Sequence, residues 1–190
     1  QGAAEFGRTV TCNVNRNGDL ITCMYLVANI NKGVRKNGTC EYGWVNKLGF
    51  AMIESCKVEV GGSKIDEQYG DWLNVWDELT RETAHDVARD AMIGNVPELT
   101  KLGGGSSTDG YTMYVPLKFW FNRNNGLALP LIALQYHDVR VTLKIREASA
   151  LINYSGTTAP TVDNDTMRDA YLLIDYVYLD SEERKRFAQA

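Results

Sequence analysis

The sequence predicts an all-β domain, an antiparallel sandwich or barrel with short helices inserted in one of its connections. About seven short segments have the alternation or the β-former content of strands, and they do not alternate one for one with helices. The two helical patterns inside the chain follow each other in a single stretch between strands. A length of 190 residues fits one domain with its own hydrophobic core.

The first predicted elements are two strands joined by a tight turn. Residues 8–14, "RTVTCNV", alternate apolar and polar side chains, as a half-buried strand does. Residues 20–30, "LITCMYLVANI", are nearly continuously apolar, which predicts a central strand covered on both faces. Between them, Asn17 and Gly18 favour the positive φ angles of a hairpin turn. We therefore expect these strands to pair, with an exposed loop over residues 31–39.

A further strand and a helix come next. Residues 50–60, "FAMIESCKVEV", alternate and stop at the Gly-Gly pair 61–62, which predicts a strand ending in a sharp corner. Residues 66–81 predict a helix, and Asp66 and Glu67 favour its N-terminus. The apolar residues of this helix recur at helical spacing, and we expect them to face the core: Tyr69, Leu73, Trp76 and Leu79.

The middle of the chain predicts a second helix and a long connection. A short helix is expected over residues 85–92, followed by a surface loop over residues 94–110 that is rich in Gly and Ser. Residues 111–121, "YTMYVPLKFWF", predict a strand, and Pro116 indicates that it lies at an edge or carries a bulge.

The last third predicts more core strands and a terminal helix. Residues 128–145 read as one or two strands, with Leu134 in the core. A polar loop is expected over residues 153–166 and a strand over residues 170–180. The final residues predict a helix that is capped by Asp180 or Ser181 and carries carboxylates in its first turn.

Charge and cysteine content exclude several function classes. The chain has 20 basic and 24 acidic residues, so it lacks the basic footprint of a nucleic-acid binder, and we expect no direct nucleic-acid partner. No apolar run approaches the roughly 20 residues that span a bilayer, so we expect no membrane insertion. The four cysteines form no C-x-x-C pair, which predicts free thiols in a reducing compartment.

The sequence offers no catalytic constellation. A metal-dependent β-sandwich enzyme needs a cluster of His and carboxylate ligands, but the chain contains only His85 and His137. No G-x-S-x-G motif occurs, and the adjacent Glu182 and Glu183 diverge on a helix. Gly103–Ser106, "GGGS", lacks the G-K-[S/T] of a phosphate loop and reads as a linker. We therefore predict no enzyme, no metal, no cofactor and no catalytic residue.

Two kinds of surface feature remain as candidates. Trp72 is a candidate stacking platform for a sugar or a base, but Tyr69 and Trp76 beside it have core-facing spacing, and core packing is the better explanation of these aromatic residues. Asn37, Asn153 and Asn164 begin N-x-[S/T] sequons in predicted loops, and they are the candidate N-glycosylation sites. The free thiols argue against passage through an oxidising compartment, and therefore against this modification.

Four blocks of sequence carry a family resemblance. They are "RNGDLI" at 16–21, "VEVGGSKIDEQYGDW" at 58–72, "VPLKFWFNRNNGLALPLIALQYHDVRV" at 115–141 and "DYVYLDSEERKRFAQ" at 175–189. In this order and spacing the chain resembles the major capsid proteins of nucleocytoplasmic large DNA viruses. The resemblance implies an antiparallel jelly-roll β-sandwich with short helices inserted in a long inter-strand connection, the first half of a double jelly roll.

The resemblance also implies a domain division and a structural role. Residues 1–180 would be the first jelly roll, with its first strand upstream of this chain. Residues 181–190 would begin a linker helix to a second jelly roll that the chain does not contain. The family's proteins form homotrimers that act as pseudo-hexagonal capsomers of an icosahedral virion assembled in the host cytoplasm. The implied partners are neighbouring capsomers and minor capsid proteins, with an internal membrane nearby but no insertion.

Three alternatives stay open at the level of sequence. A minor capsid or penton jelly-roll protein would share the fold but lack the second half. A carbohydrate-binding jelly-roll module would use Trp72 and polar groups of the loops. A cupin-like metalloenzyme would need a bound transition metal.

Overall fold

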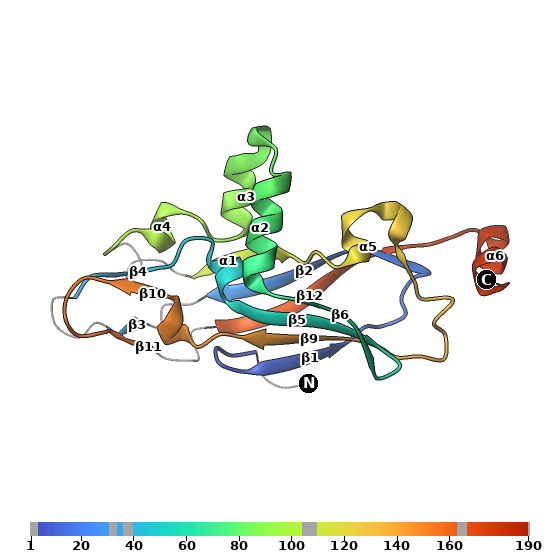
Figure 1. The fold of residues 1–190 in the computed structure, drawn as a ribbon, viewed down its shortest axis with the longest axis horizontal. Coiled ribbons are helices and arrows are strands. Elements are labelled where there is room, and N and C mark those ends of the chain that lie inside the picture. Colours follow the sequence, from blue (N-terminus) through green and yellow to red (C-terminus); the bar gives the residue numbers. More distant parts are fainter. Residues whose placement is uncertain (1–3, 31–33, 36–39, 104–109, 163–166, 190) are drawn as a thin grey trace.

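Two antiparallel sheets form the body of the protein. The computed structural model describes residues 4–30, 34–35, 40–103, 110–162 and 167–189 (Figure 1). One sheet has the strand order β1-β9-β5-β6, and the other has the order β12-β2-β7 with β8 also paired to β2. The bounds of these strands are β1 Thr9–Asn13, β2 Leu20–Ile30, β5 Ile53–Val60, β6 Ser63–Gln68, β7 Tyr111–Pro116, β8 Leu129–Pro130, β9 Val139–Ile145 and β12 Met167–Val177.

Two small sheets extend the sandwich at one end of its long axis (Figure 1). Each consists of two short antiparallel strands, and their pairing partners are far apart in the sequence. The pairs are β4 (Tyr42–Trp44) with β10 (Ile152–Tyr154) and β3 (Val34–Arg35) with β11 (Thr161–Val162).

The core lies between the two large sheets and follows the strand alternation. In β9, Arg140 and Lys144 point to solvent while the apolar residues on either side of them are buried. In β2, every second residue from Met24 to Ile30 belongs to the same buried cluster. β2 is central in its sheet, as predicted, but it is not covered on both faces, because Tyr25 and Asn29 on the other face are only half-buried. The arrangement is the predicted all-β antiparallel sandwich.

The predicted hairpin between the first two strands is wrong. β1 pairs with β9 and lies in one sheet, while β2 pairs with β12, β7 and β8 in the other. Gly18 does not have the positive φ of a hairpin turn. Gly18 instead packs closely against Tyr176: a Cβ added to Gly18 would be 2.7 Å from the Tyr176 Cβ. The turn residues instead let the chain cross between the two sheets, where the Tyr176 hydroxyl donates to the Asn15 carbonyl.

The helix predicted over residues 66–81 begins later than expected. Residues 61–62 form the predicted corner with positive φ at both glycines, and the chain then returns as β6, paired with β5. Asp66 and Glu67 therefore lie in a strand, and α2 spans Gly70–Thr80. Of the four apolar residues expected to face the core, only Leu73 is buried; Tyr69 and Leu79 are exposed and Trp76 is half-buried.

The predicted helices of the inserted connection are present between β6 and β7, and we call residues 70–100 the helical insertion. It consists of α2, the short 3-10 turn η1 (Thr83–His85), α3 (Asp86–Met92) and α4 (Pro97–Thr100). Figure 1 shows α2 and α3 rising side by side from one face of the sandwich. α1 (Leu48–Ala51) lies at their base and contacts α2.

The loops predicted around the core contain more structure than expected. Residues 94–110 include α4, whose Leu99 is buried, and residues 153–166 include part of β10 and all of β11. Residues 34–35 of the predicted loop 31–39 form β3, and the rest of that loop lies outside the described residues. The strands β3, β10 and β11 have only two or three residues each. A segment so short has no period to detect, and the predicted count of about seven strands was therefore too low.

The apolar stretch 111–145 is not a pair of long core strands. β7 ends at Pro116 and is an edge strand, as the proline indicates. The chain then forms α5 (Trp120–Arg123), the 3-10 turn η2 (Asn125–Leu127), β8, a series of turns and β9. Leu134 lies in those turns and is half-buried.

The chain leaves the sandwich through β12 and α6, as predicted. α6 spans Ser181–Gln189. Earlier in the chain, the 3-10 turn η3 (Ala148–Leu151) follows β9. Asp180 Oδ1 accepts hydrogen bonds from the backbone amides of Glu182 and Glu183, both at 2.9 Å. Asp180 is therefore the helix cap, one of the two residues that the sequence predicts for this role.

Replacing Gly70 with alanine is expected to lower stability by about 1–3 kcal/mol, because added core volume forces the backbone to move. A Cβ on Gly70 would overlap the backbone oxygens of Phe50 and Ile53, which cannot rotate away. Urea denaturation measures the change. Gly126→Ala is the matched control, since its Cβ would be 3.3 Å from the nearest atom, on the Asn124 side chain. Equal stability of the two variants would contradict the close approach of α2 to the sandwich.

Candidate interaction surface

A buried carboxylate on α2 joins α2 to α3 within the helical insertion. The Asp77 side chain on α2 is 2% exposed, and its Oδ1 lies 2.8 Å from Arg89 Nε on α3. Its Oδ2 lies 3.4 Å from Arg81 Nη2 and 3.9 Å from Lys47 Nζ. Three cations from three parts of the chain therefore meet at one carboxylate. Isolated buried charges are costly, so this cluster holds α2 and α3 in a defined arrangement.

A second set of charges surrounds this carboxylate. Arg81 also pairs with Asp90 at 2.9 Å and with Asp86 at 3.4 Å. Lys47 pairs with Glu78 and donates to Asn74 Oδ1 at 2.8 Å. Arg81 and Lys47 thus have ion-pair partners besides Asp77. Among the described residues, Arg89 forms an ion pair with Asp77 alone.

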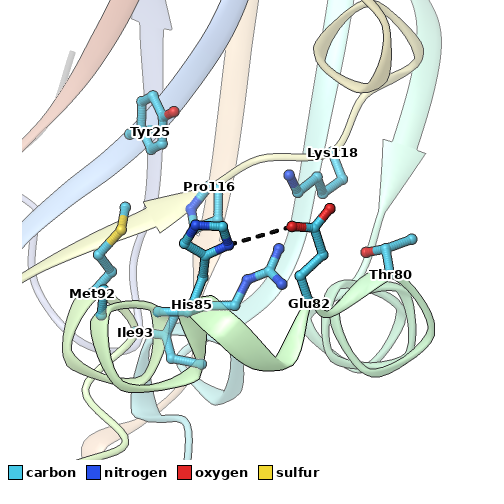
Figure 2. A pocket seen from close by; sticks show the side chains of 10 residues that line it. Tyr25, Thr80, Glu82, His85, Met92, Ile93, Pro116 and Lys118 are labelled. Atoms are coloured by element: carbon cyan, nitrogen blue, oxygen red, sulfur yellow. Dashed lines mark ion pairs between the residues drawn. The ribbon is translucent and has the colours of Figure 1, made fainter.

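A pocket of about 410 Å³ lies where the helical insertion meets the sheet β12-β2-β7. Figure 2 shows Tyr25 and Lys118 on the sheet side and Met92, His85 and Glu82 on the helical side. His85 Nδ1 lies 3.4 Å from a Glu82 carboxylate oxygen. The complete lining is Tyr25, Thr80, Glu82, His85, Ala88, Arg89, Met92, Ile93, Pro116 and Lys118.

Lys118 has an unusual environment in this pocket. Burial lowers the pKa of its ammonium group, and the nearby guanidinium of Arg89 lowers that pKa further. Among the described residues, no carboxylate forms an ion pair with Lys118 and no acceptor takes a hydrogen bond from its ammonium. Lys118 is therefore a half-buried cation without a counter-charge in contact.

The outer face of the same sheet carries exposed aromatic and aliphatic side chains. Val27 on β2 is paired with Tyr171 on one side and Tyr114 on the other, and these tyrosines are 54% and 40% exposed. In the next row, Tyr25 is paired with Leu173 and with Pro116. We call this surface the tyrosine face, and it consists of Tyr25, Tyr114, Pro116, Tyr171 and Leu173. It is continuous with the pocket, because Tyr25 and Pro116 belong to both.

The helical insertion adds further exposed apolar side chains. Leu79 and Val87 are the most exposed of them, at 76% and 87%. Trp72 is 38% exposed and lies against Trp76, with ring centroids 6.0 Å apart. The guanidinium of Arg123 covers the Trp76 ring at 4.6 Å. The candidate sugar platform is thus part of an aromatic cluster packed beside α5.

The structure describes one of the three candidate glycosylation sites and both histidines. Asn37 and Asn164 lie outside the described residues, and Asn153 is exposed but lies in β10 rather than in a loop. His85 and His137 are both exposed. Within the described ranges, no group of three or more His, Cys, Asp or Glu side chains is placed to hold a metal ion. Across the same ranges, none of the helices has the length and apolar character needed to cross a bilayer.

The four cysteines are free, as predicted, and Cys56 is expected to resist alkylation. Burial raises the pKa of its thiol to about 12, with Asp66 adding to the shift, and its side chain is inaccessible. Thiolate is the reactive form, so at pH 8 about one Cys56 in ten thousand is nucleophilic. Iodoacetamide followed by mass spectrometry should label the half-buried Cys12 and Cys23 well before Cys56. Early labelling of Cys56 would show that β5 is not in the core.

Sequence reasoning missed Asp77, Arg89 and Lys118. One signal for the first was present, since Asp77 and Arg81 are four residues apart on a predicted helix. The signal for Lys118 is a single cation inside the apolar run "PLKFWF". Neither pattern identifies the partner, because Arg89 and Lys118 reach the site from other elements.

Comparisons with known proteins agree on one family. The family model "Major capsid protein N-terminus" matches residues 1–180. Capsid protein 1 of Acanthamoeba polyphaga mimivirus is 42% identical over 99% of this chain and 34% of that protein. The major capsid protein of Pyramimonas orientalis virus is 40% identical over 99% of this chain and 44% of that protein. The chain thus spans less than half the length of these relatives.

A solved structure shows that the likeness extends to the fold. PBCV-1 VP54, whose crystal structure was fitted into a cryo-EM reconstruction of the virophage Sputnik, is 32% identical with a TM-score of 0.75. The match covers 100% of this chain and 42% of that one. The resemblance drawn from the four sequence blocks and the jelly-roll sandwich that it implies are both confirmed. This chain belongs to the major capsid protein family of the nucleocytoplasmic large DNA viruses and corresponds to the N-terminal part of its members.

Proposed function

We propose that the chain is the first jelly roll of a structural capsid protein that forms homotrimers, and that these act as pseudo-hexagonal capsomers of an icosahedral virion. The observation that carries the proposal is the family match over residues 1–180. The relatives at 42% and 40% identity are named as capsid proteins, which supports a structural and non-enzymatic role. Assembly in the host cytoplasm, and partners limited to other capsid proteins rather than nucleic acid, belong to the same proposal.

The domain division is part of this proposal. Residues 1–180 form the jelly roll, and residues 181–190 begin a linker helix toward a second one. Two observations support the boundary, since the family match ends at residue 180 and α6 begins at Ser181. A second jelly roll is consistent with relatives more than twice as long as this chain.

The surface chemistry supports assembly through two regions. Exposed apolar side chains gather on the tyrosine face and on the helical insertion, where Leu79 and Val87 are the most exposed. Contiguous apolar surface of this kind marks interaction sites on soluble proteins. A capsid tile buries such surface against its neighbours.

Size-exclusion chromatography with light scattering on the full-length protein tests the proposal. The expected mass is that of three copies at micromolar concentration, and a stable monomer would count against it. Leu173→Asp on the tyrosine face and Val87→Asp on the helical insertion identify the region involved, because both residues are exposed and neither change disturbs the core. Lys144→Gln, on the outer face of the other sheet, is the matched control.

A further inference from the structure

We propose that the pocket between α3 and the tyrosine face binds a carboxylate group carried on an apolar body, with Lys118 as its counter-ion. One side of the site is formed by Tyr25 and Pro116 of the sheet and by Lys118, which follows β7. The other side is formed by Arg89 and Met92 of the helical insertion. Figure 2 shows Met92 on the helical side, across from Tyr25 and Lys118. This proposal goes beyond the structural role proposed above. Every residue that lines the pocket belongs to one chain, so the site does not depend on trimer formation.

Lys118 is the cation of the pocket that lacks a contacting carboxylate among the described residues. Four ionisable side chains other than tyrosine line it: Glu82, His85, Arg89 and Lys118. His85 lies beside Glu82, and Arg89 Nε is bound to the buried Asp77. Lys118 is left without a contacting counter-charge among the described residues. Because a half-buried cation is costly when unpaired, an incoming anion gains more here than at a hydrated surface lysine.

The walls determine what the anion is attached to. Tyr25, Ala88, Met92, Ile93 and Pro116 give the pocket a mainly apolar lining. Its volume of about 410 Å³ falls within the range of small-ligand sites. A bare inorganic ion would leave this apolar surface uncovered, whereas an aromatic or branched aliphatic group would fill it. Met92 adds adaptability, since its unbranched side chain adjusts to the shape of a ligand.

The single unpaired cation favours a carboxylate over a phosphate. A monoanion neutralises Lys118, whereas a phosphate dianion brings surplus negative charge close to Glu82. The carboxylate could belong to a free small molecule or to an acidic side chain of a neighbouring capsid polypeptide that presents apolar residues beside it. The two sources share the same chemistry at Lys118, and they differ in whether assembly covers the pocket.

Titration of the purified, unassembled protein with phenylacetate tests the site itself. Calorimetry is expected to show saturable binding of phenylacetate and at least tenfold weaker binding of its neutral analogue phenylacetamide and of inorganic phosphate. Lys118→Met keeps an apolar stem without the charge and should weaken phenylacetate at least tenfold, while Lys101→Met, an exposed lysine outside the pocket, should not. The comparison with phenylacetamide needs no variant, so it stays decisive if Lys118→Met folds poorly.

Acetylation of lysines before and after assembly then identifies the source. Protection of Lys118 in the assembled protein, with loss of phenylacetate binding, assigns the carboxylate to a neighbouring polypeptide. If Lys118 in the assembled protein still reacts and phenylacetate still binds, the carboxylate belongs to a free molecule. Equal binding of phenylacetate to the wild type and Lys118→Met overturns the proposal, and so does absence of binding combined with unchanged Lys118 reactivity. Since the titration uses unassembled protein, its failure is distinguishable from a failure to form trimers.

Discussion

Replacing Val141 with aspartate is expected to leave the domain unfolded at room temperature. Val141 is fully buried in β9, where it is paired with Cys12 of β1 on one side and Val58 of β5 on the other. Among the residues that the structure describes, no buried cation lies in this layer of apolar side chains to offset a carboxylate. A buried aspartate without a partner costs several kcal/mol even in its neutral, protonated form, which is comparable with a total stability of about 5–15 kcal/mol.

Two substitutions in the turns before β9 provide graded controls. Leu134 is half-buried there, so Leu134→Asp places its carboxylate within reach of water and should lower stability without abolishing folding. Tyr136 is 88% exposed, and Tyr136→Asp should leave stability almost unchanged. Thermal melts followed by circular dichroism rank the three variants. A cooperative wild-type melt for Val141→Asp would show that β9 is not a core strand.

The strands with clear periodicity could be predicted from sequence, whereas their partners could not. The alternation of β9 and the apolar run of β2 are local properties, and both strands are where the sequence places them. Pairing depends on contacts across the whole chain, and the partner of β1 lies about 130 residues downstream, as Thr9 opposite Lys144 shows. A turn sequence that suits a hairpin therefore did not produce one.

The boundary between β6 and α2 shows a second limit. Residues 66–68 fit a helical pattern and carry acidic residues that suit a helix N-terminus, yet they pair with β5. The corner at Gly61 and Gly62 directs the chain back along β5, and ladder hydrogen bonds then outweigh local helix propensity. The helix begins only at Gly70, the one residue type that tolerates the backbone of Phe50 so close.

The candidate site was the least predictable part of the molecule. Lys118 and Arg89 lie far apart in sequence, and they share a pocket only because the helical insertion leans over β7. Trp72 stood out in the sequence because exposed aromatic residues often bind ligands, but the structure packs it beside Trp76. Residue type identified candidates, while the burial and pairing that give them a role depended on the tertiary fold.

Replacing Asp77 with asparagine is expected to lower the free energy of unfolding by about 3 kcal/mol, the lower end for breaking a buried ion pair. Asparagine keeps the shape of the side chain, so the change removes charge with little change in volume. Arg81 retains Asp86 and Asp90, and Lys47 retains Glu78. The cost therefore falls mainly on Arg89, whose side chain is only 23% exposed and which loses its carboxylate at 2.8 Å.

Urea denaturation of Asp77→Asn and of the adjacent Glu78→Gln separates burial from charge. Glu78 also pairs with Lys47 but its side chain is 56% exposed, so its loss should cost much less than the loss of Asp77. Adding Arg89→Met to Asp77→Asn should recover part of the lost stability, because the cation left unpaired is then removed as well. Since α2 and α3 are held together by this pair, an aspartate-specific protease, whose sites are the same in both variants, should cleave within the helical insertion of Asp77→Asn faster than in the double variant. Equal stability of Asp77→Asn and Glu78→Gln would instead mean that Asp77 is hydrated, and that the packing of Leu73 and Gly70 alone fixes the insertion on the sandwich.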